Sequence, residues 1–462
     1  MAPRTDDGPV VHLGRTLSFN SDPGDWEPRG GRPPGTQARD PQASGDDSPA
    51  CYEFHANGAL LVAQGRIAAV GPAGTLLGGL PRDIPVVDHG RHILMPGFID
   101  THIHYPQTDV IAAGGRQLLD WLEDYTFVEE ARFGDAGHAA DVAEFFLDEL
   151  TRNGTTTASV FCTVHPESVE ALFGAAAARN LCLIAGKVLM DRNAPAALRD
   201  TPASAERESR ILIERWHRRG RLHYAVTPRF ACTSTPEQLA VAGALARDHA
   251  DLYIQSHVAE NHAEIAWVRE LYPAARSYLD VYDGSGLLRE RAIYAHCIHL
   301  DAADRRRMAA SGAAAAFCPT SNLYLGSGLF DLEAADSAGM RFSTATDVGG
   351  GSSFSMLRTL DEARKVARLR GQDLTPLRAF YLATLGAARC LHLDDRIGRL
   401  AAGRDADFIA LDVDATPLIA RRTAAARTLS DELRVLMTLG DDRAIAATYV
   451  QGCCLHGRQG HS

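Results

Sequence analysis

Long hydrophobic runs are missing from this sequence. No stretch of about 18 consecutive apolar residues occurs in it, so no segment is expected to span a membrane. The first residues, MAPRTDD, lack the basic and apolar regions of a secretory signal peptide. The nine cysteines are scattered and form no Cys-x-x-Cys pair, which argues against a disulfide framework. We therefore expect a protein of a reducing compartment, the cytoplasm.

Positive charge is also scarce. Lys187 and Lys365 are the only lysines, and the formal net charge is −11. Nucleic-acid binding requires a concentrated basic surface, so nucleic acid is not an expected partner. The 462 residues, of which 45% are hydrophobic, are enough for one large core and a smaller companion domain.

Both ends of the chain have the pattern of a small β-domain. Short strand-like segments occupy residues 8–19, 52–55, 59–63, 66–70 and 84–88 near the N-terminus, and residues 399–402, 406–411 and 446–450 near the C-terminus. Ala56-Asn-Gly58 is a turn signal between two of these segments. Residues 20–50 are rich in Gly, Pro, Asp and Ser with little apolar content, so we expect a flexible insert there.

The middle of the chain alternates strand-like and helical segments. The expected strands cover residues 97–102, 155–162, 181–189, 223–227, 252–257, 292–296, 313–317 and 341–346. Helical periodicity lies between them, for example at residues 139–152 and 236–249. This alternation predicts an α/β fold, a (β/α)₈ TIM barrel with a discontinuous small β-sandwich from both chain ends. We expect the barrel at residues 95–395 and the small domain at residues 1–94 and 396–462.

Two histidines close the first expected barrel strand. The run from His92 to Ile99 is apolar and is typical of a fully buried parallel strand, and the segment continues to His104. Residues i and i+2 of a strand point to the same side, so His102 and His104 project together and can share a metal ion. The pair alone fits two hydrogen-bonded histidines equally well.

Three further residues able to bind a metal lie at later strand ends, namely His257, His296 and Asp347. The active site of a (β/α)₈ barrel forms at the C-terminal ends of its strands. Each residue alone has an ordinary explanation, because strand-end histidines often make only hydrogen bonds and an Asp before Val-Gly-Gly often caps a turn. Five such residues around one barrel predict a metal site. Histidine and carboxylate ligands without thiolate suit zinc, with iron as the second choice.

Carboxylates near these ligands are placed for proton transfer. Zinc lowers the pKa of bound water towards ~7, and Asp347 can accept the proton of that water and fix its orientation. Glu260 lies three residues beyond His257, where it can carry a proton to a ring nitrogen and then to the leaving group. The alternative for Glu260 is the exposed start of a helix at residues 261–271. We assign Glu260, Asp347 and His257 as the catalytic residues.

These motifs together resemble the amidohydrolase superfamily and, within it, the guanine deaminase family. The superfamily pattern consists of residues 96–104, the two later histidines, Asp347 and the closing segment 397–407. More specific to guanine deaminases are LLDWLEDYTF at 118–127, EARF at 130–133, GKVLMDRN at 186–193, TPRF at 227–230, QSHVAEN at 255–261 and CPTSN at 318–322. The similarity extends from about residue 60 to residue 450.

The resemblance implies zinc-dependent hydrolysis of guanine to xanthine and ammonia, in purine catabolism or salvage. Water activated by the metal would add to C2 while Glu260 protonates N3 and Asp347 orients the water. One zinc per chain would be held by His102, His104, His257, His296 and Asp347. The implied purine contacts are His104, Gln107, Arg229 and Phe230. Gln107 offers a donor and an acceptor, Arg229 donates, and Phe230 can stack on the base. The resemblance also implies a homodimer.

The position of lysine separates subgroups of the superfamily. Members with two metals need a carboxylated lysine at the end of strand 4, but here that strand ends in Pro228-Arg-Phe230 and Lys187 falls on strand 3. A mononuclear site is therefore expected. Val128 stands where the family more often has proline. His299, three residues past His296, is expected at the surface or behind the ligands.

Two other functions stay open on the sequence alone. The same chemistry can act on 8-oxoguanine, a pterin or a triazine, because loop residues decide such specificity. A catalytically silent relative that uses the fold for assembly is also permitted by the fold. The presence of all five ligands and of Glu260 argues against the silent relative.

Overall fold

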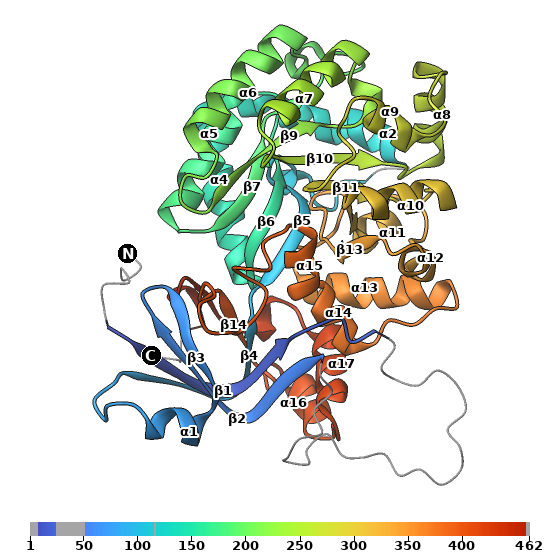
Figure 1. The fold of residues 1–462 in the computed structure, drawn as a ribbon. Helices are drawn as coiled ribbons and strands as arrows, with labels where there is room; N and C mark the ends of the chain where they lie inside the picture. Colours follow the sequence, from blue (N-terminus) through green and yellow to red (C-terminus); the bar gives the residue numbers. More distant parts are fainter. Residues whose placement is uncertain (1–7, 25–50, 115–116, 459–462) are drawn as a thin grey trace.

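The structure is a computed structural model that describes residues 8–24, 51–114 and 117–458. A barrel with surrounding helices adjoins a smaller sheet that contains strands from both ends of the chain (Figure 1). Residues 25–50, most of the expected insert, lie outside the described residues.

Eight parallel strands form the barrel in the order β5-β6-β7-β9-β10-β11-β12-β13, with the short β8 paired to β9. With β8 included, the strands are β5 Phe98–His104, β6 Thr155–Phe161, β7 Cys182–Gly186, β8 Val188–Leu189, β9 Leu222–Pro228, β10 Tyr253–Val258, β11 Ala292–His296, β12 Ala314–Phe317 and β13 Arg341–Thr344. The ring closes where Asp347 N–H donates to the His102 carbonyl at 3.0 Å and His104 N–H donates to the Val348 carbonyl at 2.8 Å. The predicted (β/α)₈ class is confirmed.

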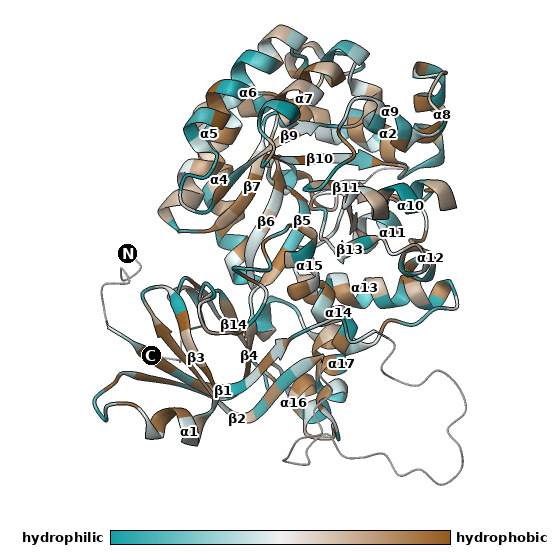
Figure 2. Ribbon diagram, in the orientation of Figure 1, coloured by the Kyte–Doolittle hydropathy of each residue, from teal (hydrophilic) through white to brown (hydrophobic). Residues whose placement is uncertain are grey.

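Most helices cover the outside of the barrel, whereas the first helix lies against the small sheet (Figure 1). The α-helices are α1 Ala73–Gly78, α2 Leu118–Trp121, α3 Phe127–Glu130, α4 Ala136–Arg152, α5 Pro166–Ala178, α6 Pro202–Trp216, α7 Pro236–Asp248, α8 His262–Leu271, α9 Tyr278–Gly284, α10 Ala302–Ser311, α11 Pro319–Tyr324, α12 Leu332–Ser337, α13 Met356–Leu369, α14 Pro376–Leu382, α15 Leu385–Cys390, α16 Pro417–Thr423 and α17 Leu429–Leu439. In α6 the buried residues recur at helical spacing, for example Ala205, Leu212 and Trp216, and the ribbon shows matching hydrophobic and hydrophilic bands (Figure 2). No described helix is long and apolar enough to cross a membrane.

The small domain contains one seven-stranded sheet in the order β16-β15-β14-β4-β1-β2-β3. Its strands are β1 Val10–Phe19, β2 Tyr52–Ala63, β3 Arg66–Pro72, β4 Val86–Pro96, β14 Phe408–Leu411, β15 Ile445–Val450 and β16 Cys453–Gly457. Neighbouring strands are antiparallel except β1 and β4, which are parallel. The expected discontinuous small domain is thus present, while the division at residues 94/95 and 395/396 stays a prediction.

The chain passes from the small sheet to the barrel at Gly97. The run from His92 to Ile99, expected as one strand, is divided between β4 and β5, so that prediction was wrong. Hydrogen-bond partners change at this point: Gly97 N–H donates to the Asp407 carbonyl at 3.1 Å, and Phe98 N–H donates to the Gly154 carbonyl at 2.9 Å. A Cβ at residue 97 would lie 2.3 Å from Thr156 Oγ1, so only glycine fits this crossing.

The turn predicted at Ala56-Asn-Gly58 is also wrong, because β2 continues through it. Gly58 pairs with Gly14 of β1 and with Pro72 of β3, so sheet neighbours on both sides hold it extended. A Cβ at residue 58 would lie 2.5 Å from Thr16 Oγ1. The glycine therefore serves close packing and not a turn.

Two other strand predictions change in the structure. Residues 399–402 form no strand; instead Leu400 N–H donates to Ser18 Oγ at 3.0 Å, so a side chain takes the place of a sheet partner. The strand expected at residues 181–189 is divided into β7 and β8 by Lys187.

Candidate active site

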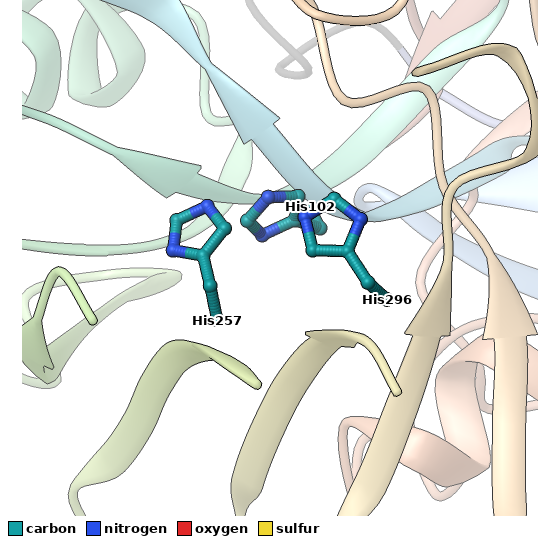
Figure 3. Close-up of side chains that lie close together, drawn as sticks. All are labelled: His102, His257 and His296. Carbon is teal, nitrogen blue, oxygen red and sulfur yellow. The ribbon is translucent and has the colours of Figure 1, made fainter. Parts of the chain in front are cut away.

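The five predicted metal ligands meet at one end of the barrel. His102 and His104 come from the end of β5, His257 from β10 and His296 from the end of β11. Asp347 follows β13 on the segment that closes the barrel. The rings of His102, His257 and His296 are turned towards one another (Figure 3), and their ligand atoms all lie within 4.8 Å of each other.

His104 and Asp347 complete this cluster. Nε2 of His104 lies 3.2 Å from Nε2 of both His102 and His257. Oδ1 of Asp347 lies 3.1 Å from Nε2 of His102 and 3.5 Å from Nε2 of His104, and its Oδ2 lies 3.8 Å from Nε2 of His296. Four imidazole nitrogens and a carboxylate thus point at one small volume.

The protonation states of these groups suit a divalent cation. Burial, followed by neighbouring positive charge, lowers the pKa of His104 and His257 well below the usual range. Burial also lowers the pKa of His296, although Asp347 opposes this effect. Burial raises the pKa of Asp347, but His102 and His296 outweigh it, so the pKa is lowered overall. Imidazole nitrogens and a carboxylate that converge on one point are a donor set that zinc takes.

Hydrogen bonds on the far side of two rings direct Nε2 into the cluster. Nδ1 of His257 lies 2.6 Å from the Arg229 carbonyl, which can only accept, so Nδ1 carries the proton. Nδ1 of His296 faces the amide of Asn322 at 2.9 Å. Among the described residues Oδ1 of Asn322 has no hydrogen-bond partner, and exchanging the amide O and N would give it one at Nδ1 of His296.

Cys318 is a neighbour of the cluster that sequence analysis did not assign. Its Sγ lies within 4.8 Å of the ligand atoms of His102 and Asp347. Burial, with the nearby Asp347 carboxylate, raises the pKa of this thiol well above its usual range, and Sγ donates to the Ala316 carbonyl at 3.3 Å. Because this hydrogen bond already engages Sγ and the five predicted ligands converge without it, we leave Cys318 outside the ligand set.

Glu260 lies beside the cluster and is 2% exposed. Its Oε2 is 3.2 Å from Nε2 of His296, and Ser327 Oγ donates to its Oε1 at 2.8 Å. Burial, followed by the carboxylates of Glu264 and Asp347, raises the pKa of Glu260 well above its usual range. A carboxyl group that retains its proton in such a place can act as a general acid.

A pocket opens beside the ligands and Glu260. The predicted purine contacts Gln107, Arg229 and Phe230 line it together with His104. Leu118, Trp121 and Leu122, from the segment that follows β5, add an apolar wall. The structure therefore brings every predicted site residue to one place, although their roles stay predictions.

The family of the chain follows from comparison with known proteins. The model of the Amidohydrolase family matches residues 93–454. Guanine deaminase of Escherichia coli (strain K12) is 49% identical over 405 residues, which cover 88% of this chain and 92% of that protein. The chain belongs to the guanine deaminase family.

Solved guanine deaminase structures have the same fold. The E. coli enzyme matches with a TM-score of 0.90 and 44% identity, over 97% of this chain and 100% of that one. A guanine deaminase from C. acetobutylicum, solved with guanine bound in its active site, matches with a TM-score of 0.84 and 25% identity, over 97% and 100% of the two chains.

Several segments quoted for the guanine deaminase resemblance supply residues that sequence analysis left without a role. Glu130, in the EARF segment, accepts hydrogen bonds from Gln107 and Arg229. Asn322, in the CPTSN segment, faces His296. Glu264 accepts the backbone N–H of Glu260 at 3.0 Å, but lies just beyond the QSHVAEN segment. For Glu130 and Asn322, the only indication in the sequence was that each lies in a segment specific to the family.

Two residues weighed for this guanine deaminase site lie elsewhere. The ring of His299 lies against that of His262 at an interplanar angle of 35°, with centroids 4.0 Å apart, and Nε2 of His299 lies 2.9 Å from the Ser327 carbonyl. Lys187 is fully buried, with Nζ 2.5 Å from Oδ2 of Asp200. Lys187 is thus paired with a carboxylate outside the cluster, where it cannot bridge a second metal to the five predicted ligands.

Proposed function

We propose that this protein is a zinc-dependent guanine deaminase that hydrolyses guanine to xanthine and ammonia in purine catabolism or salvage. The observation that carries the proposal is the convergence of four imidazoles and one carboxylate beside Glu260, which is buried within reach of His296, in a chain of the guanine deaminase family. A homodimeric state and a cytoplasmic location belong to the same proposal and rest on the resemblance and the composition.

One zinc would be held by His102, His104, His257, His296 and Asp347. When bound, zinc supplies a water whose pKa is lowered towards ~7. Asp347, with Oδ1 among the imidazole nitrogens and Oδ2 towards His296, is placed to orient that water and accept its proton.

Glu260 performs the remaining proton transfers. It gives its proton to N3 of guanine as the water oxygen bonds to C2. The resulting Glu260 carboxylate takes the proton of the hydroxyl group now at C2 and passes it to the amino group at C2. The proton that Asp347 took from the water then returns to Glu260. The bond between C2 and that nitrogen breaks, ammonia leaves, and the ring of xanthine remains. The hydroxyl of Ser327 holds Oε1 of Glu260, which leaves Oε2 on the side of His296 and the reacting atoms.

The purine is held by the opposite wall of the pocket. With C2 at Glu260, Arg229 and Gln107 donate to acceptor atoms on the O6 side of the base. Phe230, 4% exposed, forms part of the apolar wall, and its ring lies edge-on to Trp267 with centroids 6.5 Å apart.

The deciding experiment measures xanthine and ammonia release from guanine by purified protein as isolated, after chelation, and after zinc is restored. We expect equimolar release that chelation abolishes and zinc recovers. Absence of release by zinc-replete protein would reject guanine as substrate. The same assay with 8-oxoguanine, a pterin and a triazine would then identify the preferred ring.

A further inference from the structure

A buried carboxylate stands behind the two polar side chains of the purine pocket. Glu130, the last residue of α3, is 0% exposed and is not among the described residues that line the pocket. Its Oε1 accepts a hydrogen bond from Nε2 of Gln107 at 3.0 Å, and its Oε2 accepts one from Nη1 of Arg229 at 2.5 Å. One carboxylate therefore contacts both predicted purine contacts at once.

This arrangement gives the Gln107 amide a single orientation. Oε1 of Gln107 accepts the backbone N–H of Gly349 at 3.1 Å, while Nε2 donates to Glu130. A backbone N–H can only donate, and a carboxylate can only accept. Turning the amide over would lose both hydrogen bonds and place its oxygen against the carboxylate, so the donor side of Gln107 is fixed.

The guanidinium of Arg229 is held by the same helix. Glu130 forms a buried ion pair with it, and the Arg229 guanidinium carbon lies 5.4 Å from the centroid of the Phe127 ring. Phe127 and Glu130 are the first and last residues of α3, one helical turn apart. Helix α3 thus contributes an aromatic face and a carboxylate that together restrain Arg229.

We propose that Glu130 is a positioning residue that fixes Gln107 and Arg229 as hydrogen-bond donors, so that the pocket selects purines with an oxo group at position 6. The remaining N–H groups of Gln107 and Arg229 need acceptors. A 6-oxopurine offers O6 and N7 on that side, whereas a 6-aminopurine places N–H groups against N–H groups. The inference rests on the proposed function, because it takes guanine to lie with C2 at Glu260.

The test compares Glu130→Gln with Glu129→Gln as a matched control. Glu129 is the preceding residue of α3, and its carboxylate pairs with Arg132 at 2.7 Å and with His138 at 3.0 Å. In Glu130→Gln we expect KM for guanine to rise about tenfold or more, with kcat changed much less, because the base is held less well. The ratio of kcat/KM for guanine to that for 2,6-diaminopurine should fall by about tenfold. Glu129→Gln should keep the wild-type KM and the wild-type ratio.

Binding of unreactive bases separates this inference from the proposed function. Hypoxanthine carries the 6-oxo group and adenine the 6-amino group, and neither has an amino group at C2. Calorimetry should show that wild type prefers hypoxanthine and that Glu130→Gln loses this preference, whether or not guanine is deaminated. A folded Glu130→Gln variant with wild-type KM and wild-type preference would overturn the inference. If that variant does not fold, Glu130→Asp, which keeps the charge but shortens the reach, must show the same losses; unchanged preference there also overturns it.

Discussion

The carbonyl of Arg229 accepts a hydrogen bond from Nδ1 of His257 at 2.6 Å, while the side chain of Arg229 lines the purine pocket. One residue therefore serves two parts of the site through different atoms. The carbonyl directs Nε2 of His257 into the ligand cluster, and the side chain lines the pocket in which we propose that the purine binds. Substitution of the side chain leaves the carbonyl in place, so the two contributions can be separated by experiment.

Arg229→Ala should therefore raise KM for guanine by about tenfold to a hundredfold and leave the zinc content unchanged. Steady-state kinetics and metal analysis of the same preparation measure both quantities. The substitution leaves Glu130 buried without its cation, so the free energy of unfolding should fall by about 3–5 kcal/mol. Adding Glu130→Gln removes the orphaned charge and should recover part of that stability but not the KM. An unchanged kcat/KM in Arg229→Ala would exclude Arg229 from substrate binding.

Glu260→Gln should keep zinc and lose turnover. The amide can still accept the Ser327 hydroxyl but cannot exchange a proton with the purine, so kcat should fall by about 10²–10⁴-fold. The control is Glu270→Gln, an exposed position on helix α8, which begins two residues after Glu260, and this variant should keep wild-type kcat. Fixed-time product assays on proteins with equal zinc content measure kcat. A wild-type kcat in Glu260→Gln would show that Glu260 does not transfer protons in the reaction.

Asn322 should tune the affinity for zinc through His296. An acceptor at position 322 keeps the proton of His296 on Nδ1 and leaves Nε2 free to bind metal. Asn322→Leu, which offers no acceptor, should weaken zinc binding by about 10–100-fold. Asn322→Asp retains an acceptor and should bind zinc nearly as tightly as wild type. Competition with a chromophoric chelator gives both affinities, and equal affinities for Leu and Asn would contradict the prediction.

His223 of β9 should make the protein sensitive to acid. Burial, followed by His217 and nearby arginines, lowers the pKa of His223 from 6.5 to about 4. The folded state thus holds this ring neutral, while the unfolded chain protonates it below pH 6.5. Its stabilising contribution is present above pH 6.5 and is lost as the pH falls towards about 4, a loss of about 2 kcal/mol at pH 5.

The check compares urea unfolding of wild type and His223→Phe at pH 7.5 and pH 5. The phenyl ring can keep the edge contact that His223 makes with Tyr253, whose centroid lies 5.6 Å away, and it cannot be protonated. Between the two pH values wild type should lose about 2 kcal/mol more than the variant. Equal losses in the two proteins would show that His223 does not contribute.

Local patterns in the sequence were enough to predict the barrel and the strand ends that carry the predicted ligands. Apolar runs, helical periodicity and strand-end histidines are local patterns, and backbone geometry turns them directly into strands, helices and side-chain directions. The two-residue spacing of His102 and His104 sufficed to place both on one side of β5. Local signals gave a wrong secondary structure where pairing with distant segments determines the backbone. At Gly58, strands on both sides hold the chain extended in spite of the turn signal.

Which side chains meet could not be predicted in the same way, because it depends on how distant segments pack. Gln107 and Arg229 are 23 and 99 residues from Glu130 in the chain, and nothing in their spacing pairs them. They meet because the closed ring of parallel strands brings the ends of β5 and β9 to one rim, and α3 then lies across that rim. Hydrogen-bond partners such as Asn322 for His296 depend in the same way on the register between neighbouring strands and loops. That register is set by packing of the whole barrel, which no local pattern records.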